Sequence, residues 1–144
     1  MSDAVDVLTA GDRIELRFPA RGDLIVLARL VTSAISARAG FDIEQLEDLR
    51  LAVGELCLLT LQGNDVSFGD LCLELTVLGD AIGVVCTLER ASPAGSSGRV
   101  PEEADESARL SEQILDALVD EHGRESQDGS LRAWLRKRRG EHVE

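Results

Sequence analysis

Apolar residues recur at helical spacing between Asp42 and Gln62, the most regular stretch of the chain. They stand three or four positions apart, as on the buried face of a helix. The positions are Leu46, Leu49, Val53 and Leu56, with Thr60 continuing the row. Asp42 is a good N-cap, Gln45 completes a capping box, and Gly63 supplies a stop. The pattern therefore predicts one helix over 42–62.

A second helical pattern precedes this one. Asp23 is expected to cap a helix that runs to about Ala39, and Gly40 is a natural residue just past its end. The predicted inner face consists of Leu24, Leu27, Ala28, Val31, Ala34 and Ile35. Because the turn to the next helix is very short, the two helices should pack as an antiparallel hairpin.

Period-two alternation predicts strands over 13–18, 71–78, 81–89 and 131–135, with a tight turn at Gly79-Asp80. In the third strand Ile82, Val84 and Cys86 should face inward. A third helix is predicted over 107–122, closed by Gly123, with Leu110, Ile114, Leu115 and Leu118 inward. This order predicts an α+β fold, a two-layer α/β sandwich with helices on one face of a mixed, mostly antiparallel sheet.

The chain of 144 residues fits one domain. We expect a flexible N-terminal arm over 1–12, the domain over 13–139 and a tail over 140–144. Residues 90–106 carry two of the three prolines and no periodicity, so they are expected to form a loop that covers a site or has lost one.

The net charge of −12 argues against direct nucleic-acid binding, because phosphates are neutralised by clustered lysine and arginine. An acidic body instead favours a protein partner with a basic surface. The one basic run, Arg132–Arg139, is predicted to be the solvated end of the last strand. No apolar run is long enough for a membrane span and the N-terminus is acidic, so a cytoplasmic location is expected.

Three cysteines, Cys57, Cys72 and Cys86, lie in apolar stretches without the spacing of a zinc site. They are predicted to be buried free thiols, and no metal site is expected. Whether they sense redox state stays open.

Glu55 is the anomaly of the central helix, because it stands in an otherwise apolar run on a second face with Ala52 and Leu59. Two interpretations are open. The side chain is either a solvated glutamate at the edge of the buried stripe or a carboxylate aimed into a site.

The stretch 29–62 resembles the first two helices of the anti-sigma-factor serine kinases, the RsbW-type branch of the GHKL ATPase superfamily. The matching residues stand at the family's spacing without a gap. They are Arg29-Leu30, Ser33, Arg38, Gly40-Phe41, Glu47-Asp48-Leu49, Ala52-Val53, Glu55 and Cys57. Weaker similarity covers 118–121 and 129–138. The resemblance implies the histidine-kinase/HSP90-like ATPase fold.

In that family, Glu55 would be the base that activates a serine hydroxyl or a water. Four residues on, the family keeps an asparagine that holds Mg²⁺, where this chain has Leu59, which has no oxygen ligand. The adenine-reading Asp-x-Gly-x-Gly pattern falls on Leu88, Arg90 and Ser92, and the glycine-rich lid falls on Arg109, Leu110 and Ser111. These losses predict a kept fold without ATP chemistry, so no cofactor is expected.

The resemblance therefore implies an anti-sigma factor that sequesters an alternative sigma factor, of the stress or sporulation type, and regulates transcription without ATP hydrolysis. Arg29 and Arg38 on the first helix are the candidate partner-binding residues. The alternative for both is that they are exposed arginines that stabilise helix ends.

Two other functions stay open. One is an active ATP-dependent serine kinase with Glu55 as base, which needs ATP and Mg²⁺ and phosphorylates a STAS-type anti-anti-sigma protein. The other is a regulator that binds only such a protein or another signalling domain. A homodimer through the apolar stripe 24–31 is also compatible with the sequence.

Overall fold

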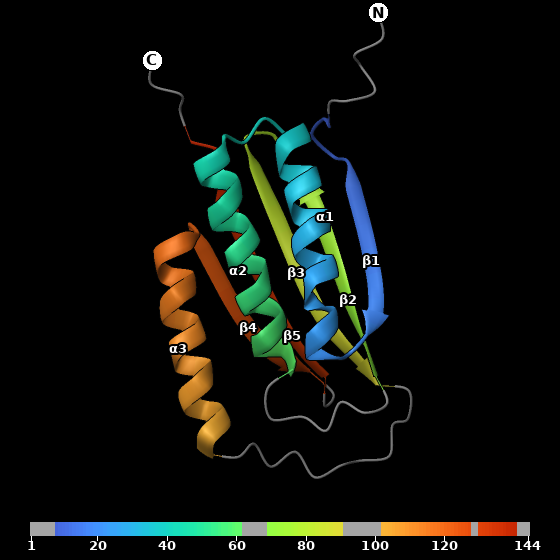
Figure 1. Ribbon diagram of the computed structural model, residues 1–144, viewed down its shortest axis with the longest axis vertical. Helices are drawn as coiled ribbons and strands as arrows, with labels where there is room; N and C mark the ends of the chain where they lie inside the picture. The colour runs from blue at the N-terminus through green and yellow to red at the C-terminus, as the bar shows by residue number, and fades with distance from the viewer. Residues whose placement is uncertain (1–7, 62–68, 91–101, 128–129, 141–144) are drawn as a thin grey trace, which may run out of the picture.

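The computed structural model describes residues 8–61, 69–90, 102–127 and 130–140. Three helices lie side by side on one face of a five-stranded sheet, as Figure 1 shows. The elements in chain order are β1 (Arg13–Pro19), a 3₁₀ turn (Gly22–Leu24), α1 (Ile25–Arg38), α2 (Ile43–Leu61), β2 (Gly69–Val77), β3 (Ala81–Arg90), α3 (Glu102–Leu118), β4 (Glu121–Gln127) and β5 (Ser130–Arg138). The predicted α+β two-layer sandwich is confirmed.

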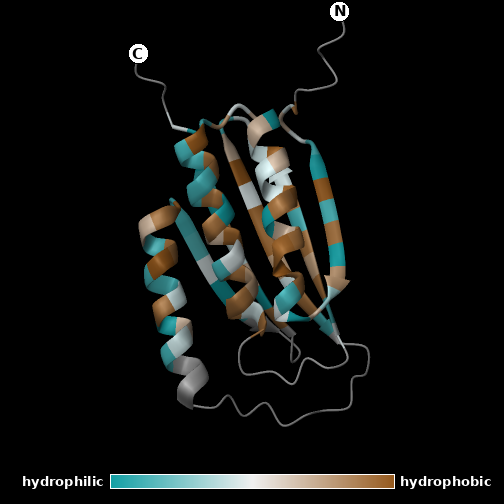
Figure 2. Ribbon diagram, in the orientation of Figure 1, coloured by the Kyte–Doolittle hydropathy of each residue, from teal (hydrophilic) through white to brown (hydrophobic). Residues whose placement is uncertain are grey.

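The sheet has the strand order β1-β2-β3-β5-β4, and each of these described pairings is antiparallel. Alternate residues of each strand face the helices, so β2 and β3 supply a buried row on that side. The row includes Leu71, Leu73, Leu75, Ile82, Val84 and Cys86, which confirms the inward residues predicted for the third strand. In Figure 2 brown residues recur along α1, α2 and the strands behind them.

Helix α2 begins with the predicted capping box. The Asp42 carboxylate accepts a 2.8 Å hydrogen bond from the Gln45 backbone N–H, and the Gln45 side-chain oxygen accepts one of 3.2 Å from the Asp42 N–H. Leu49, Val53 and the rest of the predicted inner row are buried, with Leu46 partly so. The predicted stop at Gly63 lies outside the described residues.

The start of α1 differs from the prediction. Asp23 lies in the 3₁₀ turn and pairs with Arg21 at 2.7 Å, and no side chain caps the helix. Its buried face is rotated from the predicted one, since Leu27 and Ala34 are exposed while Thr32 is buried.

The end of α1 follows the prediction. Gly40 adopts a φ of +88°, and the Phe41 N–H donates to the Ser36 carbonyl at 3.0 Å. This is the arrangement in which glycine closes a helix.

The predicted helix over 107–122 is wrong at both ends. Helix α3 begins at Glu102, within the stretch expected to be a loop, and ends at Leu118, so that Gly123 lies in the middle of strand β4. Strand β4 reads EHGRESQ and has no apolar alternation, because its place comes from pairing with β5 rather than from burial. Leu115 is buried as expected, but Leu110 is exposed.

The basic run at the end of the chain is also more ordered than predicted. Arg132 and Arg136 stand with Trp134 on the helix-free face of the sheet, while Ala133 and Leu135 point to the helices and are buried. Lys137 Nζ donates to the Leu118 carbonyl at 2.8 Å, and Arg139 Nη1 donates to the Ala39 carbonyl at 3.2 Å. Part of this run therefore ties β5 to the ends of α1 and α3.

The described part of the N-terminal segment runs beside the sheet. The Leu8 N–H donates to the Arg38 carbonyl at 3.2 Å and the Gly11 N–H donates to the Val77 carbonyl at 2.8 Å. Across the described ranges, no helix combines the length and apolar character that crossing a membrane requires.

Candidate functional site

The carboxylate of Glu55 meets a hydroxyl from another helix. Ser111 Oγ on α3 donates a 2.9 Å hydrogen bond to Glu55 Oε1 on α2, and Ser111 is only 3% exposed. Glu55 itself is half-buried. A carboxylate acceptor strengthens such a bond, so this contact fastens α3 to α2. Glu55 is thus not freely solvated, because one of its carboxylate oxygens is engaged by a side chain of α3.

The residues around Glu55 do not fit a magnesium ion. Leu59, one turn further along α2, is 2% exposed and packs in the core. Its isobutyl group offers no oxygen to a hard cation. Leu88, at the place of the expected adenine-reading acid, is likewise a buried core residue of β3. Among the side chains that the structure describes, no three of the types that ligate metals come together.

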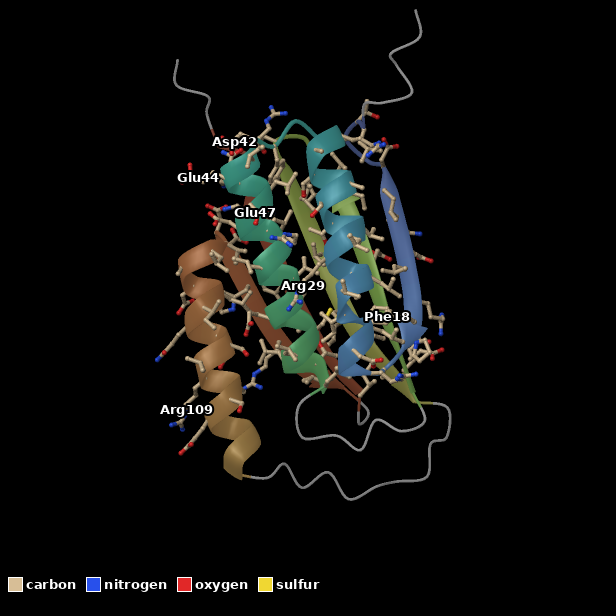
Figure 3. The ribbon with its side chains drawn as sticks, viewed as in Figure 1. Phe18, Arg29, Asp42, Glu44, Glu47 and Arg109 are labelled. Atoms are coloured by element: carbon tan, nitrogen blue, oxygen red, sulfur yellow. The ribbon has the colours of Figure 1, made fainter. Side chains whose placement is uncertain are left out.

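The residues at the expected glycine-rich lid are part of a regular helix. Arg109 and Leu110 are exposed on α3, and Arg109 points away from the body in Figure 3. Only Ser111 of this group turns toward α2. The side chain of Arg90 and the whole of Ser92 lie outside the described part of the chain.

Arg29 lies in the seam between α1 and α2. A Cβ atom added at Gly54 would stand 2.6 Å from Arg29 Nε and 2.8 Å from Arg29 Nη2, so the glycine leaves the space that the guanidinium occupies. Arg29 Nε is buried with no hydrogen-bond partner among the described residues. Figure 3 shows the Arg29 side chain between the two helices.

The outward face of α1 is apolar and free of acidic residues. The helix reads IVLARLVTSAISAR, so its only charges are Arg29 and Arg38 in a chain of net charge −12. Leu30 is 62% exposed and Val26 49% exposed, one turn apart on the side opposite the core. Ala34 and Ala37 are exposed along the same side. We call Val26, Leu30, Ala34, Ala37 and the flanking Arg29 the α1 face.

Arg38, the second predicted partner residue, is exposed at the end of α1. Its Nη1 donates to the Ala34 carbonyl at 3.1 Å, a contact within the same helix. This is the helix-end role that was the alternative for Arg38. The structure thus brings Arg29, but not Arg38, into the seam between the helices.

Two of the three thiols are buried as predicted, and the third is not. Cys57 and Cys86 are fully buried, and the neighbouring Cys86 thiol together with burial raises the pKa of Cys57 well above its usual value. Cys72 is half-buried on the helix-free face of the sheet. Partial burial, followed by the charge of Glu89, raises the pKa of Cys72 to about 11.

Comparison with known proteins places the chain near one group. It is 32% identical over 79 residues to the serine-protein kinase RsbW of Bacillus velezensis, which covers 54% of this chain and 49% of that protein. The RsbW of Bacillus pumilus is 31% identical over 78 residues, which covers 51% of this chain and 48% of that protein. The RsbW of Listeria monocytogenes is 47% identical over 47 residues, covering 33% of this chain and 30% of that protein.

The chain is similar to the RsbW serine-protein kinases. It spans about half the length, or less, of the curated relatives that it matches. No family model matches the chain. The similarity to RsbW agrees with the resemblance seen in the stretch 29–62.

Sequence reasoning missed the partners of the central residues rather than the residues themselves. Glu55 and Ser111 were both singled out, but their contact joins positions 56 residues apart. A glycine in the interior of a helix costs stability, so Gly54 was a signal that something packs closely there. The exposed apolar side chains of α1 had a signal too. The helix contains no acidic residue, so its solvent-facing side has few charged residues to occupy it.

Proposed function

We propose that this chain is an anti-sigma factor of the RsbW type, which binds and sequesters an alternative sigma factor through the α1 face. The observation that carries the proposal is the α1 face itself. Exposed leucine and valine side chains beside an arginine form an apolar centre with a cationic neighbour, the composition of a protein-binding patch. The curated relatives are named serine-protein kinases RsbW, which supports a regulatory protein of this class.

The composition of the α1 face indicates which kind of partner surface would bind it. A patch without carboxylates is suited to an apolar surface that carries an acidic side chain, which Arg29 can pair through its fork of N–H donors. This local pairing of Arg29 with an acidic side chain is a different interaction from the attraction between the acidic chain as a whole and a basic partner. The general acidity would act at longer range, on the rate of encounter.

We further propose that binding does not depend on nucleotide chemistry. The buried hydrocarbon of Leu59 supports this because it provides no metal ligand, and the bond from Ser111 supports it because it gives Glu55 a structural role between α2 and α3. The alternative, an ATP-dependent serine kinase acting on a STAS-type anti-anti-sigma protein, rests on the presence of Glu55 and on the name of the curated relatives, serine-protein kinase.

Variants on α1 test the proposal with the sigma factors of the source organism, each purified and titrated by calorimetry. Leu30→Asp and Arg29→Glu should each weaken the complex at least tenfold, since both sit in the patch. Arg109→Glu, a charge reversal at an exposed arginine of α3, is the matched control and should leave the affinity unchanged. Equal affinities for all three variants would remove the α1 face from the site.

Glu55→Gln separates the two candidate functions while keeping an acceptor for Ser111. An anti-sigma factor without kinase activity should bind its sigma factor as tightly as the wild type. A kinase would transfer phosphate from ATP to an anti-anti-sigma protein in the wild type and lose that transfer in the variant. Phosphate transfer by the wild type would make the kinase the better account.

A further inference from the structure

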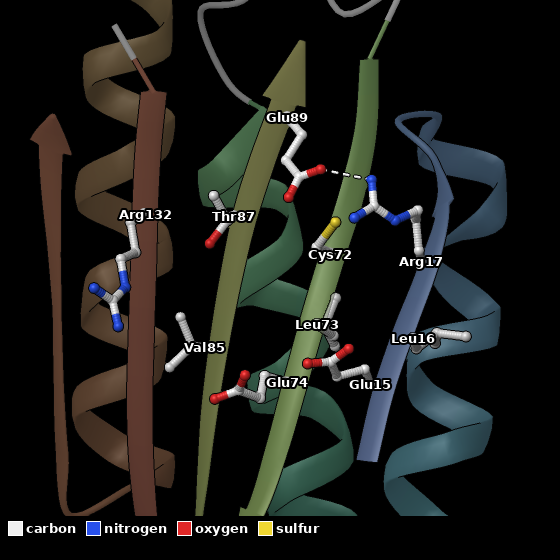
Figure 4. A pocket seen from close by; sticks show the side chains of 10 residues that line it. All are labelled: Glu15, Leu16, Arg17, Cys72, Leu73, Glu74, Val85, Thr87, Glu89 and Arg132. Carbon is white, nitrogen blue, oxygen red and sulfur yellow. Dashed lines mark hydrogen bonds and ion pairs between the residues drawn. The ribbon is translucent and has the colours of Figure 1, made fainter. Parts of the chain in front are cut away.

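Arginines on the sheet are paired with carboxylates of other strands. Figure 4 shows Arg17 of β1 beside Glu89 of β3, where Nη1 donates to Oε2 at 2.5 Å. Arg132 of β5 stands 3.6 Å from Glu125 of β4. Each of these guanidinium groups therefore already has a counter-charge on the chain itself.

Two arginines between α1 and α2 are different. Arg29 of α1 lies against Gly54 of α2, and Arg50 stands one turn before that glycine on the same side of α2, since residues i and i+4 are stacked along a helix. The Nε atoms of both arginines are buried and have no hydrogen-bond partner among the residues that the structure describes. We call Arg29 and Arg50 the arginine pair.

The seam between the two helices carries an excess of positive charge. Glu47 is the carboxylate at Arg50, whose Nη2 donates to its Oε2 at 2.5 Å. Helix α1 contributes no acid, so this contact leaves one guanidinium charge without a counterpart on α1. A buried donor that lacks an acceptor costs free energy, and an incoming acceptor would relieve that cost.

We propose that the arginine pair binds one carboxylate of the sigma factor, and that Glu47 occupies Arg50 only in the free chain. This inference rests on the proposed binding of a sigma factor through the α1 face. Two guanidinium forks suit a carboxylate, which accepts two hydrogen bonds from each planar fork. The exposed Val26 and Leu30 lie on the same helix as Arg29, so an acid carried on an apolar protein surface fits better than a free ion.

The contact between Glu47 and Arg50 is suited to such an exchange. The two side chains are 47% and 37% exposed, and a pair as exposed as this contributes little stability. A carboxylate placed between Arg29 and Arg50 would accept from two cations in a less hydrated place, where each hydrogen bond is stronger. Since neither Nε has an acceptor in the described chain, little is lost when the side chains turn to meet the ligand.

Removal of the fork of Arg50 should weaken the complex with the sigma factor. Arg50→Gln should raise the dissociation constant about tenfold, because the partner's carboxylate loses a charged donor on burial. Arg50→Lys keeps the charge and the stem but not the fork, and it should weaken the complex as well. Calorimetry measures both, with circular dichroism as the check of folding. Wild-type affinity in both variants overturns the proposal.

Removal of Glu47 should have the opposite effect. Glu47→Gln frees Arg50 and should tighten the complex about threefold, the range expected for an exposed pair. Glu44→Gln removes the same charge from the same helix and is the matched control, which should leave the affinity unchanged (Figure 3 labels both glutamates). In the Arg50→Gln background, Glu47→Gln should have no effect. Equal tightening by Glu47→Gln and Glu44→Gln would reflect general charge and overturn the exchange.

The arginine pair is also testable without a sigma factor. Inorganic phosphate serves as an oxyanion probe, titrated at constant ionic strength into the isotope-labelled full chain. Nuclear magnetic resonance should show saturable shifts of the Nε–H signals of Arg29 and Arg50, with tighter binding in Glu47→Gln. The exposed Arg109 on α3 is the control and should show no saturable shift. Unchanged signals for Arg29 and Arg50 overturn the proposal.

The two proposals fail in different ways. If Leu30→Asp and Arg29→Glu weaken the sigma-factor complex while the Arg50 variants do not, the inference about the pair is wrong and the proposed function stands. If no sigma factor binds but phosphate shifts both signals, the proposed function is wrong. The assignment of the ligand to a sigma factor is then wrong too, although the oxyanion site remains.

Discussion

At the scale of single residues, the contact between Ser111 and Glu55 has the largest consequence. A hydroxyl on one helix and a carboxylate on another meet at 2.9 Å in a half-buried place, where each would otherwise lose its hydration. The pair explains why a glutamate is tolerated in the apolar run of α2. It also means that Glu55 has a structural role whether or not it has a chemical one.

Ser111→Ala should lower the free energy of unfolding by about 1–2 kcal/mol, because the half-buried carboxylate loses a donor. Urea denaturation measures the change. Ser107→Ala is the matched control, since Ser107 is exposed on the same helix and gains the same helix propensity from alanine. If both variants are equally stable, the hydrogen bond does not hold α3 to α2.

Cys72 should be the reactive thiol of the native protein, but a slow one. Because its pKa is about 11, the rate of alkylation by iodoacetamide should rise about tenfold per pH unit through the alkaline range below pH 11. Mass spectrometry of the labelled peptides measures this. In Cys72→Ser no site should react before unfolding, since Cys57 and Cys86 are fully buried. Fast labelling of Cys72 at neutral pH would contradict the assignment.

At the scale of elements, the C-terminal hairpin depends on one glycine. Strand β4 brings no apolar alternation of its own and is held by its pairing with β5 and by the Trp134 ring lying on Gly123. A ladder of charge pairs adds to this, with Arg136 on Glu121 and Arg132 on Glu125. Pairs with such exposure contribute little each, whereas the Trp134 ring and Gly123 are in close packing contact.

Gly123→Ala should destabilise the fold by about 1–2 kcal/mol, although alanine normally suits a strand better than glycine. The methyl group would stand 2.9 Å from a rigid ring, which must move. Gly83→Ala is the matched control, because the methyl group there meets the flexible end of Leu78, which can turn away. Chemical denaturation compares the two variants, and equal stability would show that the ring does not rest on Gly123.

The elements also show what the sequence can and cannot predict. Helix α2 was predictable because its capping box, its inner row and its length are all local signals. Strand β4 was not, since pairing with a neighbour leaves no trace in the pattern of a polar strand. The candidate site divides in the same way. Glu55 and Arg29 stood out in the sequence. The contact of Ser111 with Glu55 and that of Gly54 with Arg29 could not be predicted, because only tertiary packing creates them.

At the scale of the whole molecule, the two layers present surfaces of different character. The helix layer offers an apolar, acid-free strip on α1, which we propose as the sigma-factor surface, and the sheet layer offers a face on which arginines and carboxylates stand side by side.

The most direct test of the central claim, sigma-factor binding without nucleotide, is one calorimetric titration. The sigma factor is titrated into the wild-type chain with EDTA and no nucleotide, and again with Mg-ATP. The account predicts the same dissociation constant in both conditions, because the buried Leu59 offers no oxygen ligand where the metal of a nucleotide complex would need one. A complex that forms only with Mg-ATP present would contradict the account and make the kinase function the leading one.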